Sequence, residues 1–208
     1  MTTDPNARTA SFGEEHSLSA VDRFGNYLSL RSLKKWLGDP SGKRIIDVGC
    51  GFDARLVRPV IAETEHVTLA DVSLSPTLKE IANVTCIEGL LPESLDLVGD
   101  DTQDLAMCIS VLEHVVDDKG LLRQLRRVTA PGGTVVVNVP SWAGKRALEF
   151  SAFKLGWSPA EEMEDHKRYY DPRDLWPLLV EAGFTPSRIS LRRHKFGLNT
   201  IAVCRIAP

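Results

Sequence analysis

Two acidic residues and a glycine pair mark the part of the chain where chemistry is expected. Asp47 ends a short apolar run and precedes Gly49-Cys50-Gly51, and Asp71 ends the next apolar run. Glycine permits unusual backbone torsions and lets a ligand approach the main chain closely. A carboxylate at a strand end, about 20 residues after such glycines, can accept hydrogen bonds from both hydroxyls of a ribose. The spacing predicts a site for an adenosine-containing cofactor; the alternative is a glycine turn that only makes room and an Asp71 that only caps a helix.

These residues need strands that bring them to one edge of a sheet. Short apolar runs alternate with segments of helical periodicity from Lys43 onward, which predicts a parallel sheet covered by helices on both faces. Ligands of such sheets bind at the carboxyl ends of the strands, where Asp47 and Asp71 lie. Pro59 is expected to disturb the first helix. We expect strands at 43–48, 66–70, 84–87, 105–110 and 134–139, and helices at 54–63, 75–81 and 118–128.

The C-terminal part departs from this alternation. Residues 141–167 carry aromatic side chains among charges, and we interpret them as a helical lid insert. Asp171-Pro172-Arg173-Asp174 is typical of a helix start, and Gly183 of the end of that helix. The last two strands, at about 187–192 and 200–205, have a short connection, which predicts an antiparallel pair at a sheet edge.

Length, charge and cysteine spacing limit the class of protein. The 208 residues suffice for one domain, at 43–208, with a tail and a helical segment at 1–42 that packs on it. The formal net charge of −3 and scattered basic residues argue against nucleic acid as a partner. Residues 1–11 are polar and do not have the apolar centre of a signal peptide. No apolar run approaches the roughly 20 residues that span a membrane, so we expect a cytoplasmic protein without integral membrane contact. The four cysteines lie far apart, which predicts small buried side chains and no metal site.

The order of the motifs resembles that of a known family. After Asp47-Val48-Gly49-Cys50-Gly51 come an apolar strand at 105–110, the segment Leu112-Glu113-His114-Val115, and Pro131-Gly132-Gly133-Thr134 entering another strand. Together with the terminal strand pair, this combination resembles the class I S-adenosylmethionine-dependent methyltransferases. It is most similar to the small-molecule branch that includes the ubiquinone and menaquinone biosynthesis methyltransferases. The resemblance covers about 43–139 well and 165–206 loosely.

The resemblance implies a fold and an activity. The fold is α/β: a doubly wound, mostly parallel, seven-stranded Rossmann-like sheet of strand order 3-2-1-4-5-7-6 with an antiparallel C-terminal strand pair. The cofactor is S-adenosyl-L-methionine. The activity is methyl transfer to a small-molecule acceptor, and a lipid-linked or sugar-bearing acceptor is compatible with it. The oligomeric state is left open.

The resemblance also implies a role for each matching residue. Asp47 would pair with the amino group of the cofactor. Gly49-Cys50-Gly51 would let the chain approach its methionine and ribose portions. Asp71 would accept from the ribose hydroxyls, and Val72 would lie against the adenine. Ser110 would line the methionine end of the cofactor.

Two positions depart from the family pattern. The family usually has a third glycine where this chain has Asp53, whose side chain takes up room beside the cofactor. After the third strand the family usually has an aspartate that contacts the adenine amino group, but here Leu90 follows Gly89. Leu90 cannot accept that hydrogen bond. Either Glu88, after a shift in register, or a backbone group would have to take the place of the aspartate.

Two histidines are candidate catalytic bases. An oxygen nucleophile of high pKa needs a base, and histidine titrates near neutral pH. His114 follows the fourth strand and would stand near the transfer site; the alternative is a histidine that caps or packs at a strand–helix junction. His166 lies at the end of the expected lid; the alternative is a surface histidine at the lid boundary.

Two other functions fit part of the pattern. Gly49 to Ala54 matches G-x-G-x-x-A, so with Asp71 it also fits an NAD(P)-dependent oxidoreductase. Against that reading, Asp47 beside the glycines suits an ammonium better than a pyrophosphate. A non-catalytic methyltransferase-like scaffold is the other alternative, favoured by Asp53 and Leu90.

Overall fold

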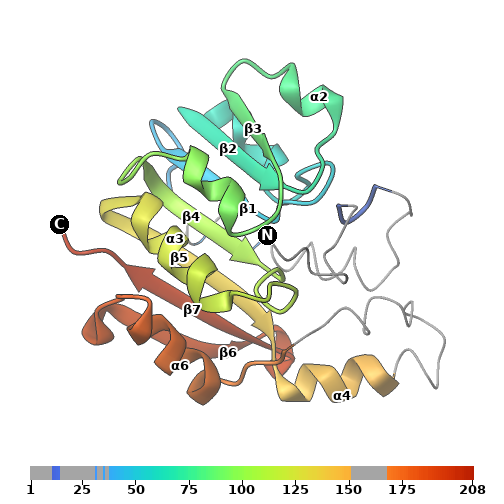
Figure 1. Cartoon of the computed structure of the whole chain (residues 1–208), viewed down its shortest axis with the longest axis vertical. Coiled ribbons are helices and arrows are strands. Elements are labelled where there is room, and N and C mark those ends of the chain that lie inside the picture. Colours follow the sequence, from blue (N-terminus) through green and yellow to red (C-terminus); the bar gives the residue numbers. More distant parts are fainter. Residues whose placement is uncertain (1–10, 15–30, 32–34, 36–37, 151–167) are drawn as a thin grey trace.

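The computed structural model describes residues 11–14, 31, 35, 38–150 and 168–208. A single twisted sheet forms its centre, and helices pack against it (Figure 1). The strands are β1 (Arg44–Val48), β2 (His66–Asp71), β3 (Val84–Glu88), β4 (Gln103–Ile109), β5 (Thr129–Pro140), β6 (Ile189–His194) and β7 (Asn199–Arg205). The helices are α2 (Pro76–Lys79), α3 (Asp118–Val128), α4 (Trp142–Phe150) and α6 (Pro172–Glu181), with 3-10 turns η1 (Arg58–Glu63), η2 (Glu93–Leu97), η4 (Pro186–Arg188) and η5 (Lys195–Gly197).

The strand order confirms the prediction. The seven strands are arranged β3-β2-β1-β4-β5-β7-β6. Strands β1 to β5 pair in parallel, and β7 runs antiparallel to both β5 and β6. The carboxyl ends of β2, β1 and β4 therefore lie side by side at one edge of the sheet.

Alternating residues of the central strands separate the core into two clusters. On one face, Val48 and Val137 pack with Leu121 of α3 and Leu175 of α6, and Figure 1 shows both helices over this face. On the other face, Ile45, Met107 and Val136 pack with residues of η1 and α2. These strands are mostly apolar because they are buried on both faces.

The first crossover differs from the predicted helix at 54–63. A 3-10 turn forms only at Arg58–Glu63. Ala54 has φ +48, a left-handed torsion that an α-helix does not contain. Pro59 stands at the start of the turn, where its missing N–H costs nothing, but it cannot donate to an earlier carbonyl. The two residues together restrict the helical part to the six residues Arg58–Glu63.

The C-terminal elements agree with the sequence pattern. Helix α6 starts directly after Asp171, whose N–H donates to Asp174 Oδ2 at 2.9 Å. Gly183, at φ +94, follows its end. Helix α4 begins the predicted lid, but 151–167 lie outside the described residues, as does most of 1–37. In the described part of the chain, no helix is both long enough and apolar enough to cross a membrane.

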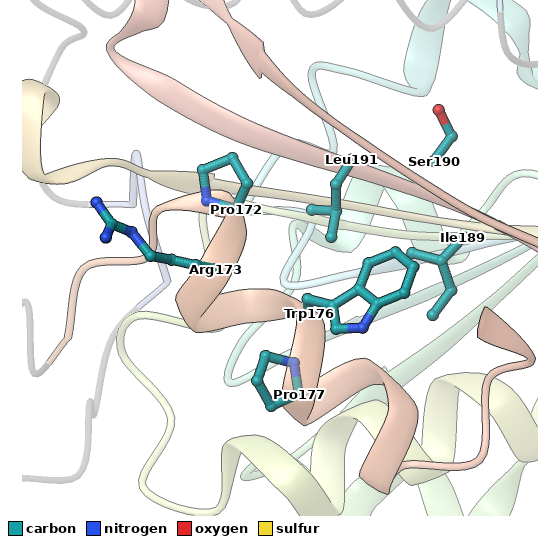
Figure 2. A pocket seen from close by; sticks show the side chains of 7 residues that line it. All are labelled: Pro172, Arg173, Trp176, Pro177, Ile189, Ser190 and Leu191. Carbon is teal, nitrogen blue, oxygen red and sulfur yellow. The ribbon is translucent and has the colours of Figure 1, made fainter. Parts of the chain in front are cut away.

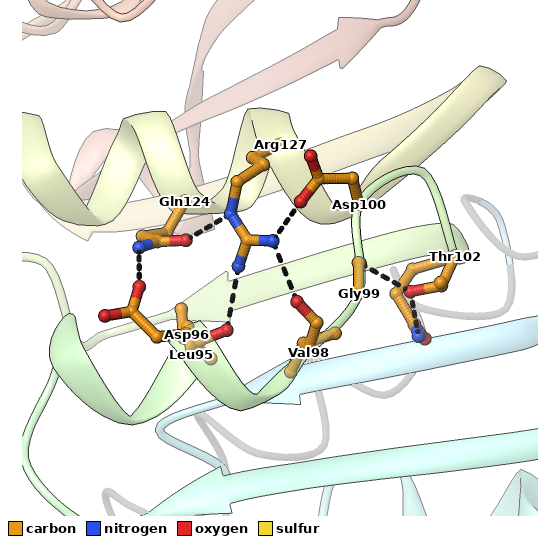
Figure 3. Close-up of polar contacts among 9 residues, drawn as sticks. Leu95, Asp96, Val98, Gly99, Asp100, Thr102, Gln124 and Arg127 are labelled. Carbon is orange, nitrogen blue, oxygen red and sulfur yellow. Dashed lines mark hydrogen bonds and ion pairs between the residues drawn. The ribbon is translucent and has the colours of Figure 1, made fainter.

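Arg127 ties α3 to the loop between β3 and β4 (Figure 3). Its guanidinium donates to the carbonyls of Leu95 and Val98, both at 2.8 Å, and contacts Asp100. Its Nε donates to Gln124 Oε1 at 2.7 Å, and Gln124 in turn donates to Asp96. The side chain of Arg127 therefore donates to one main-chain carbonyl within η2, that of Leu95, and to the carbonyl of Val98, which directly follows η2.

Replacing Arg127 with methionine is expected to reduce the free energy of unfolding by about 2–3 kcal/mol, because two carbonyls lose a charged donor. Arg126→Met, one residue earlier on α3, is the matched control and should cost no more than about 0.5 kcal/mol. Urea unfolding followed by circular dichroism measures both. Equal small losses in the two variants would show that the Arg127 contacts do not stabilise the fold.

Candidate functional site

The glycine turn after β1 needs glycine at two positions. Gly49 has φ +71, and an added Cβ would lie 2.1 Å from Val111 Cγ2, so no other residue fits without displacing Val111. Its N–H donates to Ala70 O on β2 at 2.7 Å. Gly51 has φ +74, and its N–H donates to Asp71 Oδ2 at 2.8 Å. The turn is thus fastened to the end of β2 at both glycines.

Asp47 is a buried carboxylate with an unused oxygen. The residue is 2% exposed, and among the described residues its Oδ2 has no hydrogen-bond partner. Burial, and to a lesser extent repulsion from Asp71, raises the pKa of Asp47 to about 7. Burying a carboxyl without a partner is costly. The site therefore suits a ligand that brings a cationic group, such as the ammonium of the cofactor that the sequence implies.

The carboxylate of Asp71, at the end of β2, accepts hydrogen bonds from three donors. Its Oδ2 accepts from Gly51 N, and its Oδ1 accepts from Val72 N at 2.7 Å. Ser11 Oγ lies 2.5 Å from Oδ1 and 2.6 Å from Ser73 O, and it accepts from Ser73 N at 2.9 Å. The hydroxyl of Ser11 thus occupies a position on Asp71 that a ribose hydroxyl is expected to take.

Residues 11–14 extend this contact over the glycine turn. Phe52 N donates to Phe12 O at 3.0 Å, and a Cβ on Gly51 would lie 3.1 Å from that same carbonyl. Glu14 contacts the hydroxyl of Ser73. These residues belong to the predicted N-terminal tail within 1–42. No local pattern could reveal that Ser11 reaches a carboxylate 60 residues away.

Glu88 is placed beside Asp71 but is engaged elsewhere. The two residues are register partners on β2 and β3. Glu88 Oε2 lies 2.7 Å from Lys79 Nζ, and Oε1 accepts from Leu74 N at 2.8 Å. The bond from Lys79 and then that from Leu74 lower the pKa of Glu88. Glu88 therefore anchors α2, while Leu90 is 50% exposed.

The remaining predicted residues lie around the end of β4 and the glycine turn. Ser110 follows β4 with φ +58, and its N–H donates to Asn138 O at 2.7 Å. His114 is partly buried in the next turn, where its backbone N–H donates to Val111 O at 2.9 Å. Burial raises the pKa of the Cys50 thiol well above its usual value, so this side chain stays neutral. His166 lies outside the described residues.

The predicted cofactor residues lie along one sheet edge, at the carboxyl ends of β3, β2, β1 and β4. A different depression, of about 710 Å³, lies between α6 and β6 and includes Trp176 and Leu191 (Figure 2). Strand β6 is four strands away from β1, so this groove is separate from the predicted site. Across the described ranges, no cluster of histidine, cysteine or acidic residues could hold a metal ion.

Comparison with known proteins agrees with the predicted class of enzyme. The family model described as a methyltransferase domain matches residues 15–188. The ubiquinone biosynthesis O-methyltransferase of Aeromonas salmonicida (strain A449) is 28% identical over 162 residues, which cover 71% of this chain and 67% of the relative. The enzyme of the same name from Serratia proteamaculans (strain 568) is 28% identical over 184 residues, covering 84% and 73%.

Solved structures share the fold at lower identity. A SAM-dependent methyltransferase from Archaeoglobus fulgidus superposes with a TM-score of 0.65 at 12% identity, covering 86% of this chain and 94% of that one. The 1,6-didemethyltoxoflavin-N1-methyltransferase of Burkholderia thailandensis, solved with its substrate and S-adenosylhomocysteine, gives a TM-score of 0.63 at 18% identity, covering 90% and 80%. The oxidoreductase alternative gains no support from these relatives.

Proposed function

Since this chain belongs to the class I S-adenosylmethionine-dependent methyltransferases, we propose that it transfers the methyl group to an oxygen atom of a ring-bearing small molecule. Asp47 is the observation that carries the proposal, because its buried carboxylate near the end of β1 has one oxygen without a hydrogen-bond partner among the described residues, which suits the cofactor's ammonium. The choice of oxygen is supported by relatives named ubiquinone biosynthesis O-methyltransferases. A lipid-linked acceptor is compatible with those names.

Each predicted cofactor-binding residue has a role in this proposal. Asp47 holds the ammonium, and Gly49-Cys50-Gly51 line the methionine and ribose portions. Asp71 accepts from the ribose hydroxyls after Ser11 has moved away, because two hydroxyl groups cannot occupy one position. Val72 borders the adenine and Ser110 the methionine end. Glu88 supports the adenine side through α2 and adds negative charge there.

For methyl transfer, the main task of the protein is to position the acceptor next to the cofactor. The cofactor supplies an activated methyl group on a sulfonium. The chain has to hold the acceptor oxygen in line with that methyl group, and such positioning accounts for several powers of ten in rate. His114 is partly buried after β4, next to the methionine end, and is proposed to accept the proton of the acceptor hydroxyl.

His114→Ala is expected to lower the rate of methyl transfer by about 10²–10⁴-fold, the usual contribution of a general base, and to leave cofactor affinity within about twofold. Radiolabelled transfer to a panel of phenols measures the rate, and calorimetry measures the affinity. His66→Ala, at the opposite end of β2, is the control and should change neither. Equal losses of rate and affinity in His114→Ala would instead assign the histidine to packing.

A further inference from the structure

Asn138 is a buried amide that nothing in the described chain satisfies. It lies in the central strand β5, is 1% exposed, and neither its Nδ2 nor its Oδ1 has a hydrogen-bond partner among the described residues. Leaving a buried donor or acceptor unpaired costs about 1–3 kcal/mol per group. A leucine or valine would fit the apolar run Val135 to Val139 without that cost. The amide is therefore explained better by a ligand than by stability.

The strand register places this amide on the cofactor face of the sheet. Asp47 pairs with Met107, and Met107 pairs with Val136, so these three residues form one row across β1, β4 and β5. Met107 and Val136 belong to the same core cluster as Ile45, which lies two residues before Asp47. Because side chains alternate between faces, Asn138 lies on this face too, two residues nearer the carboxyl end than Val136.

Asn138 stands on the other side of the glycine turn from Asp71. Strand β2 neighbours β1 on one side, and β4 followed by β5 on the other. Adjacent strands are 4.7–4.9 Å apart, so β5 is roughly 10 Å from β1. If the ribose lies at Asp71 and the ammonium at Asp47, the region over β4 and β5 is left for the acceptor. The backbone of Asn138 is fixed there, because its carbonyl accepts from Ser110 N.

We propose that the side chain of Asn138 binds the methyl acceptor. An amide offers two donors and an acceptor without charge, so it fits a neutral acceptor that carries a hydroxyl or carbonyl oxygen beside the methylated oxygen. A site with such groups discriminates strongly against analogues that lack them, because its own buried groups would then stay unpaired. This inference rests on the proposed function and deepens it: Asn138 positions the acceptor and leaves cofactor binding to Asp47 and Asp71.

The side-chain NH₂ resonances of Asn138 test this directly. The protein saturated with S-adenosylhomocysteine is titrated with catechol, a neutral ring with adjacent hydroxyls, up to about 10 mM. We expect catechol to shift the Asn138 NH₂ resonances, and Asn138→Leu to weaken catechol binding at least tenfold while changing affinity for S-adenosylhomocysteine by less than twofold. Thr200→Val is the control: Thr200 Oγ1 is also buried and unpartnered in the described chain, but it lies on neighbouring β7.

The outcomes separate this inference from the proposed function. Catechol that binds without moving the Asn138 resonances, equal binding in Asn138→Leu, or no catechol binding up to that concentration would overturn the role of Asn138. An equal loss in Thr200→Val would overturn it too, because any buried polar residue would then have the same effect. Failure of the wild-type protein to bind S-adenosylhomocysteine would instead contradict the proposed function, whatever the catechol titration shows.

Discussion

Asp47→Asn is expected to weaken binding of S-adenosylmethionine by about 100-fold or more. Removing one partner of a buried ion pair typically costs 3–5 kcal/mol, since the other charge is left without compensation. Asparagine keeps the shape of the side chain but cannot pair with an ammonium. Calorimetry measures the change, and Asp39→Asn, at an exposed aspartate in the turn before β1, is the control. A loss of less than threefold would remove Asp47 from the ammonium site.

The same substitution should stabilise the cofactor-free protein at alkaline pH. The pKa of Asp47 rises from 3.8 to about 7 on folding, so the folded protein holds this proton more tightly than the unfolded chain. The contribution of this proton to the free energy of unfolding is therefore fully present below pH 3.8. It is lost as the pH rises to about 7, which lowers the free energy of unfolding by up to about 4 kcal/mol. Asparagine does not ionise, so its advantage in urea unfolding should be larger at pH 8 than at pH 5. A variant less stable than the wild type at pH 8 would contradict this account.

Cofactor affinity of the wild type should depend on pH through the same group. With a pKa of about 7, most Asp47 side chains are ionised at pH 7.5 and few at pH 6, so affinity should be about eightfold weaker at the lower pH. Asp47→Asn should lose this dependence. An equal pH dependence in the variant would assign it to another group.

Substitutions of Asp71 and Ser11 are expected to act in opposite directions on cofactor affinity. Asp71→Ala should weaken binding of S-adenosylmethionine at least tenfold, about 1.4 kcal/mol, because the ribose hydroxyls lose their acceptor. Ser11→Ala should strengthen it by about tenfold or more, because a hydrogen bond to a charged group, worth about 1.5–3 kcal/mol, no longer has to be broken first.

Titration calorimetry of the two variants measures this pair of effects. Ser41→Ala, in an exposed turn, is the control for Ser11→Ala and should leave the affinity unchanged. A loss of affinity in Ser11→Ala would mean that residues 11–14 contribute to holding the cofactor. Unchanged affinity in Asp71→Ala would remove its ribose role.

Much of the sheet could be predicted because its strands appear in the sequence as short apolar runs. Runs such as Leu105 to Ile109 are apolar at every position, as burial on both faces requires, and helix α3 starts and ends at the predicted residues. The order of the strands came from the family resemblance. The helix expected after the glycine turn was wrong in its first residues, because the left-handed torsion of Ala54 cannot be read from alanine.

The site residues that could be predicted are those at the carboxyl end of a strand that the sequence itself reveals. Asp47, the next-to-last residue of β1, and Asp71, the last residue of β2, lie near the carboxyl ends of two neighbouring parallel strands. Ser11 was missed because its partner is distant in sequence. Asn138 could have been found, since it is the one polar residue within Val135 to Val139, and a polar residue there has no structural reason to be present. Glu88 was predicted as a substitute for the adenine-binding aspartate, but its carboxylate is already bonded to Lys79 and Leu74. The sequence does not reveal these two contacts.

Calorimetric titration of the purified protein with S-adenosylmethionine, S-adenosylhomocysteine and NADH separates methyl transfer from the alternative functions. We expect roughly micromolar dissociation constants for the first two ligands and no heat from NADH. Binding of NADH without binding of S-adenosylmethionine would contradict it. So would the absence of binding by all three, since Asp47 would then be a buried carboxylate without a ligand.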